Sequence, residues 1–460
     1  EHSWFKESRS SKDSPYHDYY IWRTGGERAG VPIPPNNWDS LFEGRAWEYE
    51  PALDEWYLHI FAKGQPDLNM DNPCVRAEVE EILRFWLDLG VDGFREDVIT
   101  FTSKAEGLPD DYLMVSGARG LRFYENGPRL HEFLAQFRDN VLVHYDCMTV
   151  GEAPMITPSK ALPFIEEGPN QTLDLMFHFE HMGADCLFTD YVPLPFSLRR
   201  LKAAFDRWQH KLDGRAWNAL YLENHDHPRI VSRYGSEAFR EKSAMMLACS
   251  YLFQKGTPFV YQGQEIGMVN TRFSTIGEVP DVSAKNQYAK RIAAGDTPEK
   301  AMELVNRAAR DHARTPMQWS DEAHAGFCPA DVEPWFAENP NYLEINVARD
   351  EMDPNSVLNF YRKAIRLRRA LPVVREGSYR AYKRASGVLY VYAREMADER
   401  LLVLCSFADH DVRFRVPKGY GLEEGALELC NYESEGITLP MGGRVTFRPY
   451  ECRVYRFGKA

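Results

Sequence analysis

The sequence has no long apolar run and no cluster of basic residues. No stretch approaches the ~18 consecutive apolar residues that a membrane-spanning helix needs, so we expect no contact with a membrane. There is also no run of Lys and Arg of the kind that follows a phosphate backbone, and the formal net charge is -13. Nucleic acid is therefore excluded as an expected partner.

The sequence also lacks the cysteine spacings that build disulfide frameworks or zinc sites. Its eight cysteines form no CxxC pair and no His/Cys cluster, and they lie scattered at Cys74, Cys147, Cys186, Cys249, Cys328, Cys405, Cys430 and Cys452. Such spacing favours reduced thiols in a cytoplasm over an oxidised scaffold. We expect no metal ion and no cofactor.

The first residues, "EHSWFKESRSSKD", include neither Met nor an apolar signal sequence. The composition of the 460 residues, 44% hydrophobic and 27% charged, is that of an ordinary globular protein. This length is too great for one small core and predicts two or three domains.

The composition changes along the chain. Up to about Asn69 the sequence is rich in Trp, Tyr, Pro and Gly, which predicts short strands joined by turns. Residues 75–90 then show helical spacing of apolar residues and end on Gly90, a typical helix C-cap. Short apolar runs follow in 91–97, 147–153, 173–180, 218–226 and 256–267, and helical stretches in 128–142, 198–212 and 236–256 lie between them.

This alternation of strand and helix predicts parallel strands with crossover helices. Each predicted strand carries polar residues at its carboxyl end, namely Asp97, Glu152, Glu180, His225 with Asp226, and Glu265. A (β/α)₈ TIM barrel places its chemistry at these ends. An open doubly wound sheet is the alternative, but no glycine-rich phosphate turn follows any strand. Only five units are present, and at ~30 residues each the three missing units amount to ~90 residues.

After Pro372 the pattern becomes that of alternating strands, as in "GVLYVYARE", "RLLVLCSFA", "VRFRVP" and "GRVTFRPYECRVYRF". Such strands predict a small antiparallel β-sandwich domain at the carboxyl end of the chain.

Three carboxylates at different strand ends suggest a reaction. In "GFREDVI" the side chains of Arg95 and Asp97 share one face of the strand, and the arginine would keep the aspartate charged, as a nucleophile requires. Glu152 and Asp226 follow later strands, and this arrangement suits glycoside hydrolysis.

Plainer interpretations stand beside these. An Arg–Asp pair at a strand end is often only an ion pair, and a lone His225 is more often a core residue. The aromatic residues are mostly core, although Phe42, Phe61, Trp22 and Trp47 fall in loop-like regions that suit stacking on a sugar.

Several motifs together resemble those of a known family. "GFREDVI", "MTVGEA" and "ENHDHPR" are similar, in order and spacing, to signature regions of the α-amylase superfamily of glycoside hydrolases, and "QPDLN" is similar to a signature of its oligo-1,6-glucosidase branch. "GTPFVYQGQEIGM" and "RDHARTPMQW" extend the likeness. The resemblance implies Asp97 as nucleophile, Glu152 as general acid/base and Asp226 as transition-state stabiliser.

The resemblance further implies residues that contact the glucose at the cleavage site. These are Arg95, His225 and Arg310, with Phe61 and Phe42 flanking the sugar. It also implies an inserted, loop-rich domain B over residues 1–71, barrel strands four to eight within 72–378 and the sandwich over 379–460. Because the family places "T-S-D-E-H-x-W-F" after its third strand, the opening "EHSWF" resembles a family member without its first three barrel units. Glu96 departs from the family, which usually has an apolar residue there.

The residue after the nucleophile bears on which bond is cut. Relatives with Val at this position resemble α-1,6 hydrolases, whereas those with Thr favour α-1,4 bonds, and here it is Val98. The resemblance therefore favours a monomeric oligo-1,6-glucosidase that acts on small oligosaccharides. Trehalose-6-phosphate hydrolase and α-1,4-glucosidase are the near alternatives. An inactive fragment, or a non-enzymatic interaction protein of the same fold, is the alternative from another class.

Overall fold

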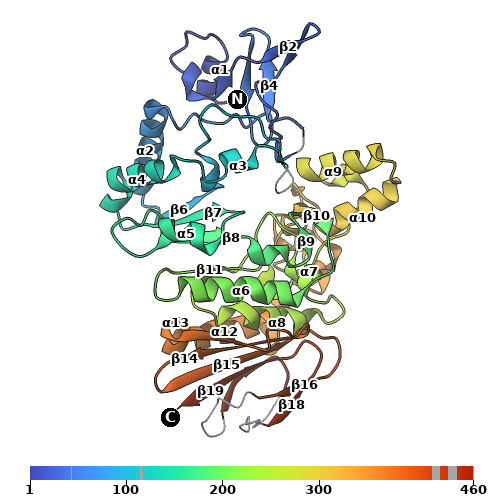
Figure 1. The fold of residues 1–460 in the computed structure, drawn as a ribbon. Helices are drawn as coiled ribbons and strands as arrows, with labels where there is room; N and C mark the ends of the chain where they lie inside the picture. The colour runs from blue at the N-terminus through green and yellow to red at the C-terminus, as the bar shows by residue number, and fades with distance from the viewer. Residues whose placement is uncertain (43, 114–117, 417–424, 434–442, 459–460) are drawn as a thin grey trace. The chain divides into compact units, whose positions relative to one another are not determined.

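The computed structural model describes residues 1–42, 44–113, 118–416, 425–433 and 443–458 (Figure 1). The chain divides into two compact units, Glu1–His178 and Phe179–Ala460. Each unit is described by itself.

The helices and strands of the first unit are short apart from α2. Its helices are α1 (Ser3–Ser8), α2 (Pro73–Asp88), α3 (Leu121–Tyr124), α4 (Leu130–Asn140) and α5 (Pro158–Ile165). Its strands are β1 (Trp22–Arg23), β2 (Gly26–Arg28), β3 (Val31–Ile33), β4 (Trp47–Glu50), β5 (Glu55–Leu58), β6 (Gly93–Glu96), β7 (Met148–Ala153) and β8 (Leu175–His178).

Aromatic side chains form the core of the first 71 residues. Strands β1, β5 and β4 make a small antiparallel sheet, as the short apolar stretches predict. Trp22 and Trp47, only 6% and 2% exposed, are part of this core. The expectation that these two indoles stack on a sugar is therefore wrong, because they are already covered by protein. Helix α1 was not expected, since six residues are too few to show a helical period.

A three-stranded parallel sheet in the order β6-β7-β8 carries the first predicted strand ends. Arg95 pairs with Val150 and Glu96 with Gly151, so β6 and β7 end at the same level. Within the described residues β6 has a strand on one side only. Helix α2 ends at Asp88, and Gly90 adopts φ +93° just beyond it, as the sequence predicts for a C-cap.

The second unit holds the remaining elements. Its helices are α6 (Leu198–Leu212), α7 (Ile230–Tyr234), α8 (Arg240–Leu252), α9 (Val282–Ala293), α10 (Pro298–Ala308), α11 (Val347–Met352), α12 (Val357–Ala370) and α13 (Pro372–Glu376). Its strands are β9 (Cys186–Leu187), β10 (Thr189–Pro193), β11 (Ala219–Leu220), β12 (Thr257–Pro258), β13 (Ser378–Tyr382), β14 (Leu389–Glu395), β15 (Glu399–Ser406), β16 (Val412–Arg415), β17 (Ala426–Cys430), β18 (Arg444–Phe447) and β19 (Cys452–Gly458).

The parallel strands of the second unit are much shorter than the sequence suggests. Among its described residues, β11 and β12 are the one parallel pair, Ala219 with Thr257 and Leu220 with Pro258. In the part of the chain that the structure describes, the parallel strands thus make a three-stranded and a two-stranded sheet, and no closed barrel is seen. Helix α6 covers the predicted 198–212, whereas α9 and α10 were not predicted.

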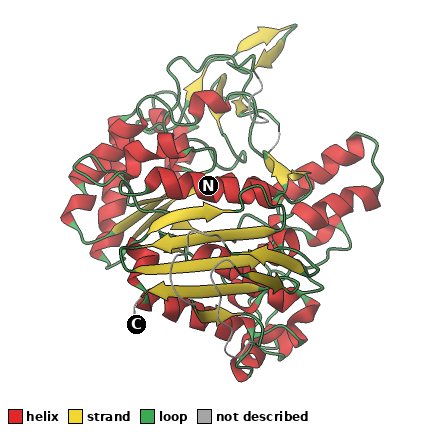
Figure 2. Cartoon of the chain, turned by 60° about the horizontal axis from the view of Figure 1, so that its bottom comes forward, coloured by secondary structure: helices red, strands yellow, loops and turns green. Residues whose placement is uncertain are grey.

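The antiparallel sheet at the carboxyl end confirms the expected β-structure. Five strands lie in the order β13-β14-β15-β19-β17, and Figure 2 shows the long ones side by side. Tyr390, Val403 and Val454 belong to the core shared with α8 and α12, whereas Val391 and Leu404 pack with β16 and β18. Both faces of this sheet are therefore buried, which explains why its strands read as nearly continuous apolar runs.

One surface of the first unit is unusually apolar. Helix α2 and the residues after it expose Ile82, Phe85, Trp86, Leu89 and Val91 by 46%, 58%, 48%, 65% and 36%. We call these five residues the α2 stripe. Contiguous exposed apolar side chains of this size are uncommon on monomeric soluble proteins and promote association.

The α2 stripe predicts how the 460-residue chain behaves in solution. We expect Phe85→Glu combined with Trp86→Lys to increase the soluble yield severalfold and to shift the protein towards monomer, because two large apolar side chains are replaced by charged ones. Light scattering after gel filtration measures this shift. Trp335→Lys is the matched control, since Trp335 is 81% exposed but lies outside the stripe. An equal gain from the control would show that the stripe has no special role.

Candidate active site

Asp97 and Glu152 lie at the carboxyl ends of neighbouring parallel strands. Asp97 directly follows β6, and Glu152 is the fifth residue of β7. The register, in which Glu96 is opposite Gly151, puts the two carboxylates on the same face and at the same level of the sheet. The strand ends thus bring two acids together that are 55 positions apart in the sequence.

One guanidinium joins these two acids. Arg95 donates from Nη1 to Asp97 Oδ1 and from Nη2 to Glu152 Oε2, the latter at 2.6 Å. The side chain of Asp97 is 74% exposed, whereas that of Glu152 is 7% exposed. The two carboxylates therefore share a partner but differ in their contact with solvent.

This difference sets the protonation of Glu152. Burial raises the pKa of Glu152 to about 7, the charge of Arg95 opposes the rise, and the neighbouring Asp97 adds to it. A carboxyl whose pKa lies near neutral pH can both give and take a proton.

Val98 follows Asp97 in a strained conformation. Its φ of 34° and ψ of 43° are left-handed, which β-branched residues rarely adopt. Its N–H donates to Glu152 Oε2 at 3.1 Å. The backbone after Asp97 therefore contacts the second acid directly.

Phe42 and Phe61 lie together in the same unit. Their ring centroids are 5.4 Å apart in an edge-to-face arrangement. Phe61 also stacks on Phe101 at 6.4 Å, and Val98 packs against the same apolar cluster. Both phenylalanines are half-buried and so keep some surface for a ligand.

The second unit holds the other predicted residues. Asp226 Oδ1 accepts hydrogen bonds from Arg310 at 3.1 Å and from Arg314 at 2.7 Å. His225 Nε2 lies 3.2 Å from Asp226 Oδ2. Burial alone would raise the pKa of Asp226, but the bond to His225 and the charges of both arginines lower it well below its usual range.

Two members of this second group were not predicted. Arg314 bonds Asp226, and Asp281 accepts from Arg310 Nε at 2.7 Å. Arg314 stands four residues after Arg310 in "RDHAR", and this spacing was a signal that the sequence offered. Asp281 gave no such signal, because it belongs to a different segment.

The other predicted strand-end acids have different surroundings. Glu180 pairs with Arg207 at 2.9 Å and accepts from the Trp208 indole at 3.0 Å. Glu265 lies in the short helix Gln264–Ile266, and burial raises its pKa. The contacts of Glu180 are those of a structural ion pair.

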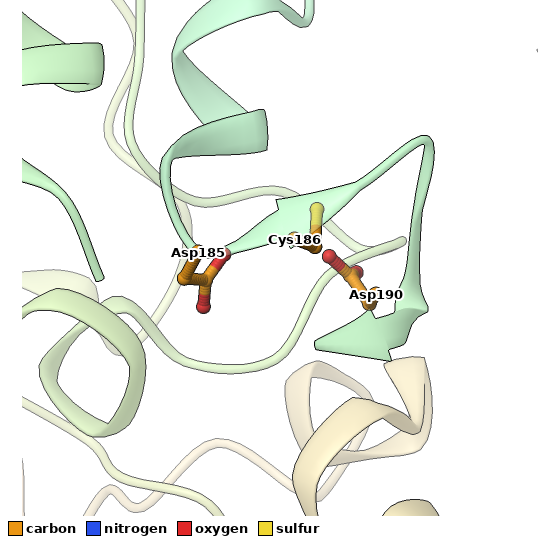
Figure 3. Close-up of side chains that lie close together, drawn as sticks. All are labelled: Asp185, Cys186 and Asp190. Atoms are coloured by element: carbon orange, nitrogen blue, oxygen red, sulfur yellow. The ribbon is translucent and has the colours of Figure 1, made fainter. Parts of the chain in front are cut away.

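Asp185, Cys186 and Asp190 are the one group among the described residues whose His, Cys or carboxylate atoms lie close enough to hold a metal ion, within 4.8 Å of one another (Figure 3). The Arg233 guanidinium contacts Asp185 at 2.6 Å and Asp190 at 2.9 Å, and His227 lies 2.6 Å from Asp190. Arg233 thus supplies the positive charge that a cation would bring, and burial raises the pKa of the Cys186 thiol to about 12. We interpret this group as a buried ion-pair network.

Glu96 points to the face opposite Asp97. Its Oε2 is buried and has no hydrogen-bond partner among the described residues. The residue opposite it in the sheet is Gly151, where even a Cβ would come within 2.9 Å of Leu173 and Ile99. Burial, and secondarily the charge of Asp174, raises the pKa of Glu96 to about 7.

Comparison with known proteins identifies the family of this chain. The family described as "Alpha amylase, catalytic domain" matches residues 1–377. The oligo-1,6-glucosidase of Parageobacillus thermoglucosidasius is 44% identical over 463 residues, which cover 99% of this chain and 80% of the relative. The chain belongs to the α-amylase family.

Other relatives place this α-amylase family member in the α-glucosidase branch. The trehalose-6-phosphate hydrolase of Bacillus subtilis is 38% identical and is covered to 80% of its length. Among solved structures, Bacillus licheniformis trehalose-6-phosphate hydrolase matches with a TM-score of 0.90 at 37% identity, covering 100% of this chain and 81% of that one. Isomaltulose synthase from Klebsiella sp. LX3 matches with a TM-score of 0.91 at 34% identity, covering 99% of this chain and 80% of that one.

These matches establish a glycoside hydrolase of the α-amylase family that is similar to oligo-1,6-glucosidases. Among the described residues, no helix combines the length and the apolar character that crossing a membrane demands.

Because the carboxyl of Glu96 is buried, we expect the protein to lose stability as pH rises. The carboxyl has a higher pKa in the folded protein (about 7) than its ordinary value of 4.5. Its contribution to the free energy of unfolding therefore falls as pH rises from 4.5 to 7 and is constant above that. We expect Glu96→Gln to leave the free energy of unfolding unchanged near pH 4.5 and to raise it by up to about 3 kcal/mol at pH 8.

Urea denaturation at pH 4.5, 6 and 8 measures this difference. Glu106→Gln, at an exposed position of the same unit, is the matched control. A difference between Glu96→Gln and the parent that is the same at all three pH values would contradict the assignment.

Proposed function

We propose that this protein is a retaining α-glucosidase that hydrolyses α-1,6 bonds at the non-reducing end of isomalto-oligosaccharides. The observation that carries the proposal is the unequal pair of acids on one arginine. Asp97 is exposed and paired with Arg95, whereas Glu152 is buried with a pKa of about 7. A nucleophile and a proton donor need this contrast.

The roles follow from these environments. Glu152 gives its proton to the glycosidic oxygen while Asp97 attacks the anomeric carbon, so that the bond to the leaving sugar breaks and a glycosyl ester forms on Asp97. Glu152 then takes a proton from water, the water oxygen bonds to the anomeric carbon, and Asp97 is released. The retaining reaction needs carboxylates ~5 Å apart, and their sharing of one guanidinium supports such a spacing.

The remaining residues serve binding in this proposal. Asp226 stays charged over the whole working pH range, because two arginines and His225 stabilise its carboxylate, and it stabilises the transition state through the sugar hydroxyls. Arg95, His225 and Arg310 are assigned to glucose binding. Phe61 and Phe42 flank it with their exposed ring surfaces.

Trehalose-6-phosphate hydrolysis is the second candidate. It is favoured by the relatives of that name at 38% identity in sequence and 37% in structure. Parallel assays with isomaltose, maltose and trehalose 6-phosphate distinguish the candidates. The highest kcat/KM on isomaltose is the expected result, and the highest value on trehalose 6-phosphate would replace the first proposal by the second.

Asp97→Asn tests the proposed nucleophile. We expect it to lower kcat by about 10⁴-fold or more without loss of folded structure, because the amide cannot attack the anomeric carbon. Asp92→Asn, at the other end of the same strand, is the matched control. Substantial turnover by Asp97→Asn would identify another nucleophile.

The assay uses two proteins, residues 1–460 and a chimaera that adds the part of the P. thermoglucosidasius relative lying outside the matched region. We expect activity from the chimaera and none from residues 1–460 alone, because the described parallel strands form only two small sheets. An inactive chimaera would favour the interpretation as a non-enzymatic protein.

Val98→Thr tests the choice of bond. The hydroxyl replaces one methyl group in the wall beside the nucleophile, and we expect the maltose/isomaltose ratio of kcat/KM to rise by about tenfold, which corresponds to ~1–2 kcal/mol. Val91→Thr, outside the site, is the control. An unchanged ratio would place linkage specificity in other residues.

A further inference from the structure

The peptide N–H of Val98 contacts the carboxylate that the proposed function makes the proton donor. Glu152 Oε2 accepts this N–H at 3.1 Å and also Arg95 Nη2 at 2.6 Å. Two donors therefore converge on one of the two carboxylate oxygens.

An oxygen that accepts two N–H groups is a poor place for a hydroxyl proton. A proton on Oε2 would point at one of the two donors and displace it, whereas Oε2 as the carbonyl oxygen keeps both bonds. When Glu152 is neutral, its proton therefore belongs on Oε1.

The backbone around Val98 is held in place for this contact. Val98 is left-handed, with φ 34°, although its two γ-methyl groups make that conformation costly. Its side chain packs against the apolar cluster that includes Phe101 and Tyr124, and its carbonyl accepts the N–H of Phe101 at 2.8 Å. Packing on one side and a hydrogen bond on the other thus keep the strained peptide in position.

We propose that Val98 is a positioning residue: its left-handed backbone aims its N–H at Glu152 Oε2 and, together with Arg95, assigns the transferable proton to Oε1. The proposal rests on the function proposed above and adds to it the atom from which the proton leaves. It separates two tasks of Val98, since the proposed function gives its side chain a part in the choice of bond and its N–H orients the acid.

The experiment removes the N–H and leaves the side chain intact. The α-hydroxy acid analogue of valine, incorporated at position 98, replaces the amide by an ester. We expect the pKa of Glu152, followed through its ¹³C carboxyl shift, to rise by about one unit, because a hydrogen bond that favours the charged form is lost. In the active chimaera we expect kcat to fall about tenfold with KM nearly unchanged.

Two controls accompany the ester at position 98. An ester at Thr102 removes another N–H of the same turn, which bonds Ile99 O at 3.4 Å and does not touch Glu152, and it should shift neither the titration nor kcat. Val98→Gly adopts φ > 0 without strain and keeps the N–H, so the titration of Glu152 should stay as in the parent.

The outcomes separate the two proposals. An unshifted Glu152 titration in the position-98 ester would overturn the positioning role, as would an equal shift from the Thr102 ester or from Val98→Gly. The titration does not depend on turnover. A chimaera that cleaves no α-glucoside but shows the shift would therefore refute the proposed function and leave the positioning role standing.

Discussion

The first half of the candidate site depends on the Arg95 guanidinium. Two carboxylates at adjacent strand ends would repel each other and could not both be charged at neutral pH. Arg95 lies between them and donates an N–H from one nitrogen to Asp97 and from another to Glu152, so the two acids stay close, while burial raises the pKa of Glu152. The same contrast between a solvated and a buried acid separates nucleophile from proton donor in glycoside hydrolases generally. The register of β6 and β7 therefore places the two acids side by side, and Arg95 holds both of them in that arrangement.

The backbone also determines where the two acids of the first unit lie. Because β6 and β7 are paired in parallel with Glu96 opposite Gly151, the acids share a face and a level. The chain then turns at Val98, and that turn delivers an N–H to the same oxygen that Arg95 holds. On the other face, opposite Glu96, the missing side chain of Gly151 leaves room for Leu173 and Ile99. A carboxyl buried on that face costs stability at neutral pH.

The sequence predicted those features that depend on local pattern. Helix α6 shows a clear apolar period and was found at its observed bounds. The C-terminal strands were found because their runs of apolar residues are long, although the expected alternation is weak where both faces are buried. Strands β11 and β12, of two residues each, were overestimated, since an apolar run does not show where backbone pairing ends. Helix α9 was missed because it buries only Ala284 and has no apolar face to detect. Trp22 and Trp47 look like surface aromatics in a Pro- and Gly-rich stretch, and only tertiary packing shows that they are core. The role of Asp281 likewise could not be predicted from the sequence, because its partner Arg310 is 29 positions away.

The C-terminal sheet has two buried faces, and one of them belongs to the core that contains α8 and α12. Domains that are exchanged in evolution usually meet at small, polar interfaces, so that separating them exposes little hydrophobic core. Here the strands from β13 onwards share an interior with the helices before them. A homologous sheet could therefore be grafted onto this chain only if its inner-face residues, such as those at Tyr390, Val403 and Val454, changed together with α8 and α12. We therefore expect the sheet and these two helices to vary together among related sequences.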